Sequence, residues 1–134
     1  MPHLVIQYTP DLERDCDLDA LCRRLADTLV AAADDAGQPV FPTGGVRVLA
    51  MPAAHHAVAD GQHAAAFAYL NLRIAPGRSA AARQRVGEAL AEVVRAHFEP
   101  VLKRRHVGIT LQIDEGVPVF DARLGNLHAL YRKD

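Results

Sequence analysis

Pro2 is the first residue of this chain whose type and position could do chemistry. If the initiating Met1 is removed, the nitrogen of Pro2 becomes a secondary amine, which can act as a general base. The following residues alternate like a strand, so this nitrogen would stand at the end of a rigid element. If Met1 stays attached, the same nitrogen is an amide. Pro2 is therefore a candidate proton acceptor on the condition that Met1 is removed.

Two arginines are candidates for tuning such a base and for binding an anion. An α-amine has a pKa of about 7.7 to 8, and burial or a nearby cation lowers it toward neutral pH. Arg47 belongs to a predicted strand, whereas Arg78 stands directly before Ser79, a predicted helix cap. Main-chain amides and the dipole at a helix start favour a bound anion. An ordinary solvated loop arginine remains the alternative for Arg78.

The histidines do not form a metal-binding pattern. His55, His56 and His63 are close in sequence, but no cysteine or carboxylate cluster accompanies them at regular spacing. We therefore expect no metal. His97 falls on the apolar face of a predicted helix and is expected to be a hydrogen-bonded core or interface residue, and we assign no role to His3.

Composition limits the class of protein further. The 134 residues include 15 basic and 16 acidic side chains, which gives no general reason to expect nucleic acid or an anionic membrane as partner. Cys16 and Cys22 match neither a metal site nor a disulfide framework, so we expect free thiols. No apolar run approaches the roughly 18 residues of a membrane helix. These features favour a soluble cytoplasmic protein.

Hydrophobic periodicity and turn residues predict four strands and two helices. Asp17 and Ser79 are expected to cap the helices, Gly37 to end the first, and Pro100 to end or kink the second near Glu99. The histidine-containing segment 53–63 is expected to be a loop. The predicted strands are 4–8, 46–51, 66–74 and 107–114.

The spacing of these elements predicts the architecture. The two sets of element starts are offset by 61 or 62 residues, which indicates one 134-residue domain with an internal repeat, 1–62 and 63–134. Right-handed crossovers in two strand-helix-strand units give an α+β fold, a four-stranded mixed sheet with both helices on one face. The other face is apolar enough that we expect self-association to bury it. A monomer whose C-terminal segment, with residues 124–130, crosses that face is the alternative.

Several motifs, in order through nearly the whole chain, resemble the 5-carboxymethyl-2-hydroxymuconate isomerase family of the tautomerase superfamily. They are Pro2-His3, Phe41-Pro42 with Gly44-Gly45-Val46-Arg47, Ala59-Asp60-Gly61-Gln62-His63 with Phe67, Gly77-Arg78-Ser79 with Arg83-Gln84 and Gly87-Glu88, and Asn126-Leu127-His128-Ala129. The resemblance implies a tautomerase-like fold, a homotrimer, no cofactor, and a small-molecule carboxylate substrate from aromatic (homoprotocatechuate) breakdown.

The resemblance also implies roles for three residues. Pro2 would be the catalytic base, while Arg47 and Arg78 would bind substrate carboxylates and stabilise charge on the 2-oxo oxygen. Leu49 departs from the pattern, because a basic residue often stands there in the family. Two alternatives stay open: a non-catalytic oligomeric carboxylate-binding module, and a superfamily enzyme acting on a different 2-oxo acid or a halogenated acid.

Overall fold

The computed structural model describes residues 2–132, so Met1, on which the basicity of Pro2 depends, lies outside the described residues. In chain order the elements are β1 (His3–Tyr8), η1 (Pro10–Arg14), α1 (Leu18–Ala31), η2 (Thr43–Gly45), β2 (Arg47–Pro52), β3 (Ala65–Ile74), α2 (Ala80–Leu102), β4 (His106–Glu115) and η3 (Leu127–Tyr131). The three η elements are short 3-10 turns.

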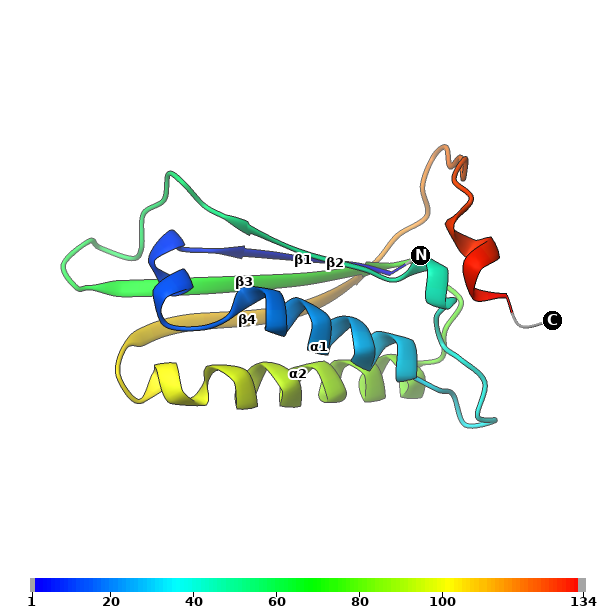
Figure 1. Ribbon diagram of the computed structural model, residues 1–134, viewed down its shortest axis with the longest axis horizontal. Coiled ribbons are helices and arrows are strands. Elements are labelled where there is room, and N and C mark those ends of the chain that lie inside the picture. Colours follow the sequence, from blue (N-terminus) through cyan, green and yellow to red (C-terminus); the bar gives the residue numbers. More distant parts are fainter. Residues whose placement is uncertain (1, 133–134) are drawn as a thin grey trace.

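The four strands form one mixed sheet in the order β2-β1-β3-β4. β1 runs parallel to β2 and antiparallel to β3, and β3 runs parallel to β4. Both helices lie on the same face of the sheet (Figure 1). This arrangement confirms the predicted α+β class with two successive β-α-β units.

The core lies between the sheet and the two helices. Alternate strand residues, such as Leu4 and Ile6 of β1 and Leu70 and Leu72 of β3, are completely buried there. The predicted caps also form: the carboxylate of Asp17 accepts a hydrogen bond from the amide of Ala20 at 3.0 Å, and Ser79 does the same for Ala82 at 3.1 Å. Local sequence therefore fixes where each helix begins against the sheet.

Gly37 does not end α1, and Pro100 does not end α2. α1 ends at Ala31, because Ala32 is extended and its carbonyl accepts the amide of Val40 at 2.9 Å. Gly37, with φ of +76°, instead closes a turn inside the following loop. α2 continues through Pro100 to Leu102. Phe98 and Val101 on either side of the proline are buried, and this packing holds the last turn against the core.

The face of the sheet opposite the helices is open. Strand register places Arg47, His3, Arg73 and Asp114 in one row across all four strands, which we call the first row. The apolar residues predicted for this face are not buried: Val5, Phe67 and Tyr69 are half-buried, and Leu49 and Met51 are exposed. The C-terminal segment lies at the end of the sheet nearest the N-terminal end of β1 (Figure 1), so it does not follow the predicted alternative of crossing the open face.

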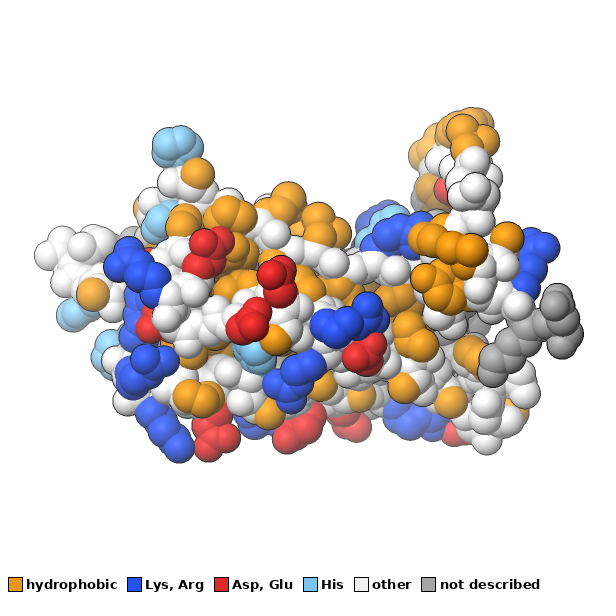
Figure 2. Space-filling view, in the orientation of Figure 1, with side chains coloured by type: hydrophobic (Ala, Val, Ile, Leu, Met, Phe, Trp, Pro, Cys, Tyr) orange, Lys and Arg blue, Asp and Glu red, His pale blue; other side chains and the backbone are white. Residues whose placement is uncertain are grey.

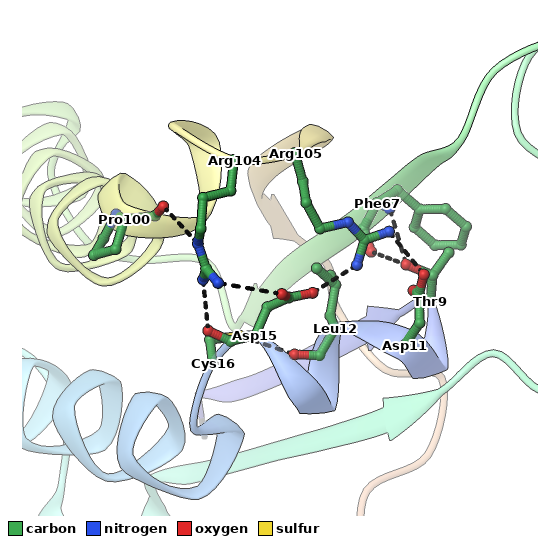
Figure 3. Close-up of polar contacts among 9 residues, drawn as sticks. All are labelled: Thr9, Asp11, Leu12, Asp15, Cys16, Phe67, Pro100, Arg104 and Arg105. Atoms are coloured by element: carbon green, nitrogen blue, oxygen red, sulfur yellow. Dashed lines mark hydrogen bonds and ion pairs between the residues drawn. The ribbon is translucent and has the colours of Figure 1, made fainter.

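At the other end of the sheet, where β1 ends and β4 begins, ion pairs join the segment before β4 to η1 (Figure 3). The guanidinium of Arg105 donates to Asp15 at 2.6 Å and to Asp11 at 2.7 Å, which joins the chain before β4 to η1. Arg104 reaches the carbonyl of Asp15 at 3.4 Å. Thr9 accepts the amide of Phe67 at 3.2 Å and so connects the end of β1 to β3.

Residues 117–124, which we call the tail, project from the body of the molecule. The tail exposes apolar side chains that a solvated loop does not need: Val117, Val119, Phe120 and Leu124. Figure 2 shows apolar side chains gathered on this projection. In the described part of the chain, no helix is long and apolar enough to cross a membrane.

Candidate active site

Pro2 lies directly before β1 and is buried. Its carbonyl accepts a hydrogen bond from the main-chain amide of Arg47 at 3.1 Å. This contact exists because β1 and β2 are parallel neighbours whose first residues are in register. The sheet thus fixes Pro2 through its carbonyl and leaves its nitrogen outside the strand pairing.

Arg47 is half-buried at the start of β2, and its Nη1 donates to the carbonyl of Gly44 at 2.7 Å. Gly44 cannot carry a side chain, because an added β-carbon would lie 2.9 Å from Cα of His128. The turn η3 therefore rests directly on η2. Through this stacking the C-terminal end of the chain supports the loop that orients Arg47.

Arg78 follows β3 and precedes the cap of α2. Its Nε donates to the carbonyl of Val40 at 3.1 Å, and its Nη1 donates to that of Ala75 at 2.9 Å. The guanidinium carbon lies 4.8 Å from the ring centroid of Phe41, within cation–π range. These contacts exclude a freely solvated loop arginine. They leave Nη2 of Arg78 without a protein partner among residues 2–132.

The three predicted site residues occupy the same end of the sheet: Pro2 before β1, Arg47 at the start of β2, and Arg78 after β3. Pro2 and Arg47 are directly hydrogen-bonded, whereas Arg78 bonds to neither. Arg47 lines a cleft of about 730 Å³ between α1 and β2. His3 lines a separate cavity of about 230 Å³, and neither Pro2 nor Arg78 lines either space.

Arg47 places a positive charge near Pro2 and His3 at this end of the sheet. Partial burial lowers the pKa of His3, and nearby positive charge, including that of Arg47, lowers it further. Since Arg47 is hydrogen-bonded to Pro2, its positive charge favours the neutral, basic form of an amine at Pro2. The arrangement therefore suits proton abstraction next to bound anions.

Of the histidines, His97 makes the hydrogen bonds that were expected of it. His97 joins the two helices: Nε2 lies 3.0 Å from the carbonyl of Asp17 and Nδ1 lies 3.3 Å from Arg24, which confirms the hydrogen-bonded role expected for it. His56 contacts the carbonyl of Ala53 at 2.9 Å in the loop. Among residues 2–132, no three histidine, cysteine or acidic side chains are grouped to hold a metal ion.

Sequence reasoning missed the residues that hold Arg78 in place. Phe41 supplies the ring beneath its guanidinium, and Val40 and Ala75 supply carbonyls. Main-chain acceptors cannot be recognised from residue types, and the sequence pattern around a buried phenylalanine indicates only a core residue.

The protein has the doubled β-α-β sheet of the tautomerase superfamily of isomerases, with arginines near the first residue of β1. A crystal structure of a 5-carboxymethyl-2-hydroxymuconate delta-isomerase superposes with a TM-score of 0.95 at 52% identity, covering 100% of this chain and 95% of that one. A 5-carboxymethyl-2-hydroxymuconate isomerase from Deinococcus radiodurans R1 gives 0.86 at 32% identity, with coverage of 98% and 95%.

The sequence comparisons agree with the structural ones. The model of the 5-carboxymethyl-2-hydroxymuconate isomerase family matches residues 2–131, and the chain belongs to this family. It is 30% identical over 132 residues to the 5-carboxymethyl-2-hydroxymuconate Delta-isomerase of Escherichia coli, covering 98% of this chain and all of that protein.

Proposed function

We propose that the protein is a cofactor-independent isomerase acting on 5-carboxymethyl-2-hydroxymuconate or a closely related 2-hydroxydienoic acid, in cytoplasmic breakdown of aromatic (homoprotocatechuate) compounds. Family membership over residues 2–131 supports the reaction type. The observation that carries the proposal is the placement of Pro2, hydrogen-bonded to Arg47, at the sheet end that also holds Arg78.

In the proposed mechanism, the Pro2 amine removes the proton of the 2-hydroxyl group and forms a dienolate. The electron pair moves along the conjugated chain, and the protonated amine returns the proton to a carbon, which gives the 2-oxo isomer. Since the base becomes its own conjugate acid, one group serves both steps. The mechanism requires removal of Met1, because an amide nitrogen cannot accept the proton.

The arginines have complementary roles in this mechanism. A guanidinium binds carboxylate in bidentate fashion and stabilises charge that grows on an enolate oxygen. Arg47 has one nitrogen committed to Gly44, and Arg78 has Nε and Nη1 committed to carbonyls. Both therefore retain donors for substrate while the protein holds the rest of each side chain rigid.

We further propose that the protein works as a homotrimer. The open sheet face and the exposed apolar side chains of the tail support self-association. Symmetric closure of identical subunits buries such surfaces in the same way in each copy.

Leu49 supports a second candidate. It stands on the open face of the sheet, beside the row that carries Arg47, where a cation would add anion affinity. A non-catalytic carboxylate-binding module, or an enzyme for another small 2-oxo acid, would keep the arginines with a different pocket charge. Such a protein would bind carboxylates without ketonising a 2-hydroxymuconate.

Ketonisation by the native protein and by Pro2→Ala tests the proposal. We expect Pro2→Ala to lose at least about a hundredfold in kcat, the scale of a general base. Pro10→Ala, which changes a proline at the far end of β1, should retain activity. Intact mass should show the loss of Met1, and a small electrophilic 2-oxo acid should alkylate Pro2 alone. Full activity of Pro2→Ala would overturn the proposal.

A further inference from the structure

The cavity of about 230 Å³ beside His3 has a basic lining that the proposed mechanism does not use. Arg73 and Arg123 contribute guanidinium groups to it, and it lies where the tail leaves the sheet. Figure 2 shows arginine or lysine and histidine side chains side by side at the foot of the projecting segment. The first row places Arg73 on the far side of His3 from Arg47. Two arginines thus flank the strand that begins after Pro2.

Arg73 forms no ion pair with the carboxylate that stands beside it in the sheet. Its register partner on β4 is Asp114, but the carboxylate of Asp114 accepts a hydrogen bond from the side-chain amide of Asn71 at 2.6 Å. Among residues 2–132, Arg73 has no ion pair. By contrast, Arg123 is paired with Asp121 at 3.2 Å. Arg73 is therefore the arginine of this cavity that forms no ion pair among the described residues, although the charge of Asp114 lies on the neighbouring strand.

Gly116 lies against the guanidinium of Arg73, whose side chain is exposed. A β-carbon on Gly116 would lie 3.0 Å from Cζ of Arg73 and closer still to Nη2. The backbone of Gly116 is not left-handed, so conformation alone does not call for glycine. Its amide donates to the carbonyl of Ile74 at 3.2 Å, which fixes it against the end of β3. The missing side chain leaves room for the guanidinium of Arg73.

We propose that Arg73 is a specificity-determining residue that binds a carboxylate remote from the reacting 2-hydroxyl group. This inference rests on the proposed function. Arg47 and Arg73 stand two strand spacings apart, or roughly 10 Å between their Cα atoms, on the same face of the sheet. A substrate held near Pro2 and Arg47 can extend a second carboxylate toward Arg73. The protein should then favour substrates with several carboxylates over those with one.

A series of three substrates tests this role. They are 5-carboxymethyl-2-hydroxymuconate with three carboxylates, 2-hydroxymuconate with two, and 2-hydroxypenta-2,4-dienoate with one. We expect Arg73→Gln to raise KM about 10- to 100-fold for at least the tricarboxylate, the scale of a lost charge-assisted hydrogen bond, with kcat nearly unchanged. KM for the monocarboxylate should stay within about twofold. Arg95→Gln, which removes an equal charge from the exposed surface of α2, should change none of these values.

Gly116→Ala tests the position of the guanidinium, because the added methyl group would displace it. It should reproduce part of the Arg73→Gln defect and add little to it in the double variant, because both changes act on one contact. An equal loss on all three substrates, or no loss on any, would overturn the role of Arg73. If the native protein ketonised none of them, the proposed function would fail separately. Calorimetric binding of the tricarboxylate to native protein and Arg73→Gln would still decide whether Arg73 binds it.

Discussion

At the scale of single residues, Arg78 shows how a flexible side chain is made rigid. Two carbonyls and the ring of Phe41 fix its guanidinium before any substrate arrives. An arginine held in this way loses little conformational freedom on binding a carboxylate, so more of the interaction energy remains for affinity and catalysis. Phe41 is therefore expected to act on the reaction through Arg78.

Phe41→Leu separates this positioning role from simple core packing. Loss of the cation–π contact should lower kcat/KM about 2- to 30-fold, while stability falls by roughly 1 kcal/mol. Phe98→Leu is the matched control, since Phe98 is equally buried in α2 but lies away from Arg78. Kinetics and urea unfolding of both variants measure the two effects. Equal kcat/KM losses in both would assign Phe41 to packing alone.

The sequence indicated Pro2, Arg47 and Arg78 as candidates because their chemistry is carried by residue type and by neighbouring turn residues. It did not indicate Phe41 or Arg73. Phe41 matters through a ring face that only the fold brings to Arg78, and Arg73 matters through the room left at Gly116, 43 residues later in the chain. Relations of this kind appear only when segments are brought together in space.

At the scale of elements, His97 connects the two helices. It contacts the carbonyl of Asp17, which caps α1, and the guanidinium of Arg24 about two turns further along that helix. Burial lowers the pKa of His97, the hydrogen bond to the carbonyl of Asp17 opposes this shift, and the charge of Arg24 lowers the pKa further. The neutral ring, with its proton on Nε2, satisfies both contacts.

This connection predicts a loss of stability in mild acid. Because the pKa of His97 is lower in the folded protein, the unfolded chain binds the proton more readily, and stability declines as pH falls below about 6.5. His97→Gln should make the free energy of unfolding less dependent on pH between about 7 and 5. Chemical unfolding at several pH values measures this. His3→Gln is the comparison, since the pKa of His3 is lowered too; an unchanged slope in His97→Gln would contradict the prediction.

Helix starts were predictable, whereas helix ends were not. Asp17 and Ser79 mark helix starts because each cap is a local hydrogen bond within one turn. The end of α1 depends on the pairing of Ala32 with Val40 across a loop, and the last turn of α2 depends on core packing that outweighs the cost of Pro100. Both are tertiary effects.

At the scale of the whole molecule, the tail is the part least explained by a single chain. Phe120 is highly exposed and stands among other apolar side chains on a segment that projects from the body. Such a segment would be costly in a monomer, whereas burial of each large apolar side chain contributes about 1.5 to 3 kcal/mol. We therefore expect the tail to pack against a neighbouring copy.

Phe120→Asp tests this expectation. Native protein should sediment at about three times the 14.5 kDa chain mass, and the variant should dissociate at concentrations at least about tenfold higher. Leu102→Asp, at the exposed end of α2, is the control and should leave assembly unchanged. A native monomer at micromolar concentration would rule out the homotrimer.

The way Pro2 is anchored has a practical consequence for anyone producing this protein. The sheet holds Pro2 by a hydrogen bond to its carbonyl and does not use its nitrogen. A purification tag or a retained formyl-methionine on that nitrogen would therefore leave the hydrogen bond to Arg47 in place. Circular dichroism, melting temperature and chromatographic behaviour would all report a sound preparation. Such a preparation would nevertheless lack the Pro2 amine that the proposed mechanism requires, and assays of folding would not detect its inactivity.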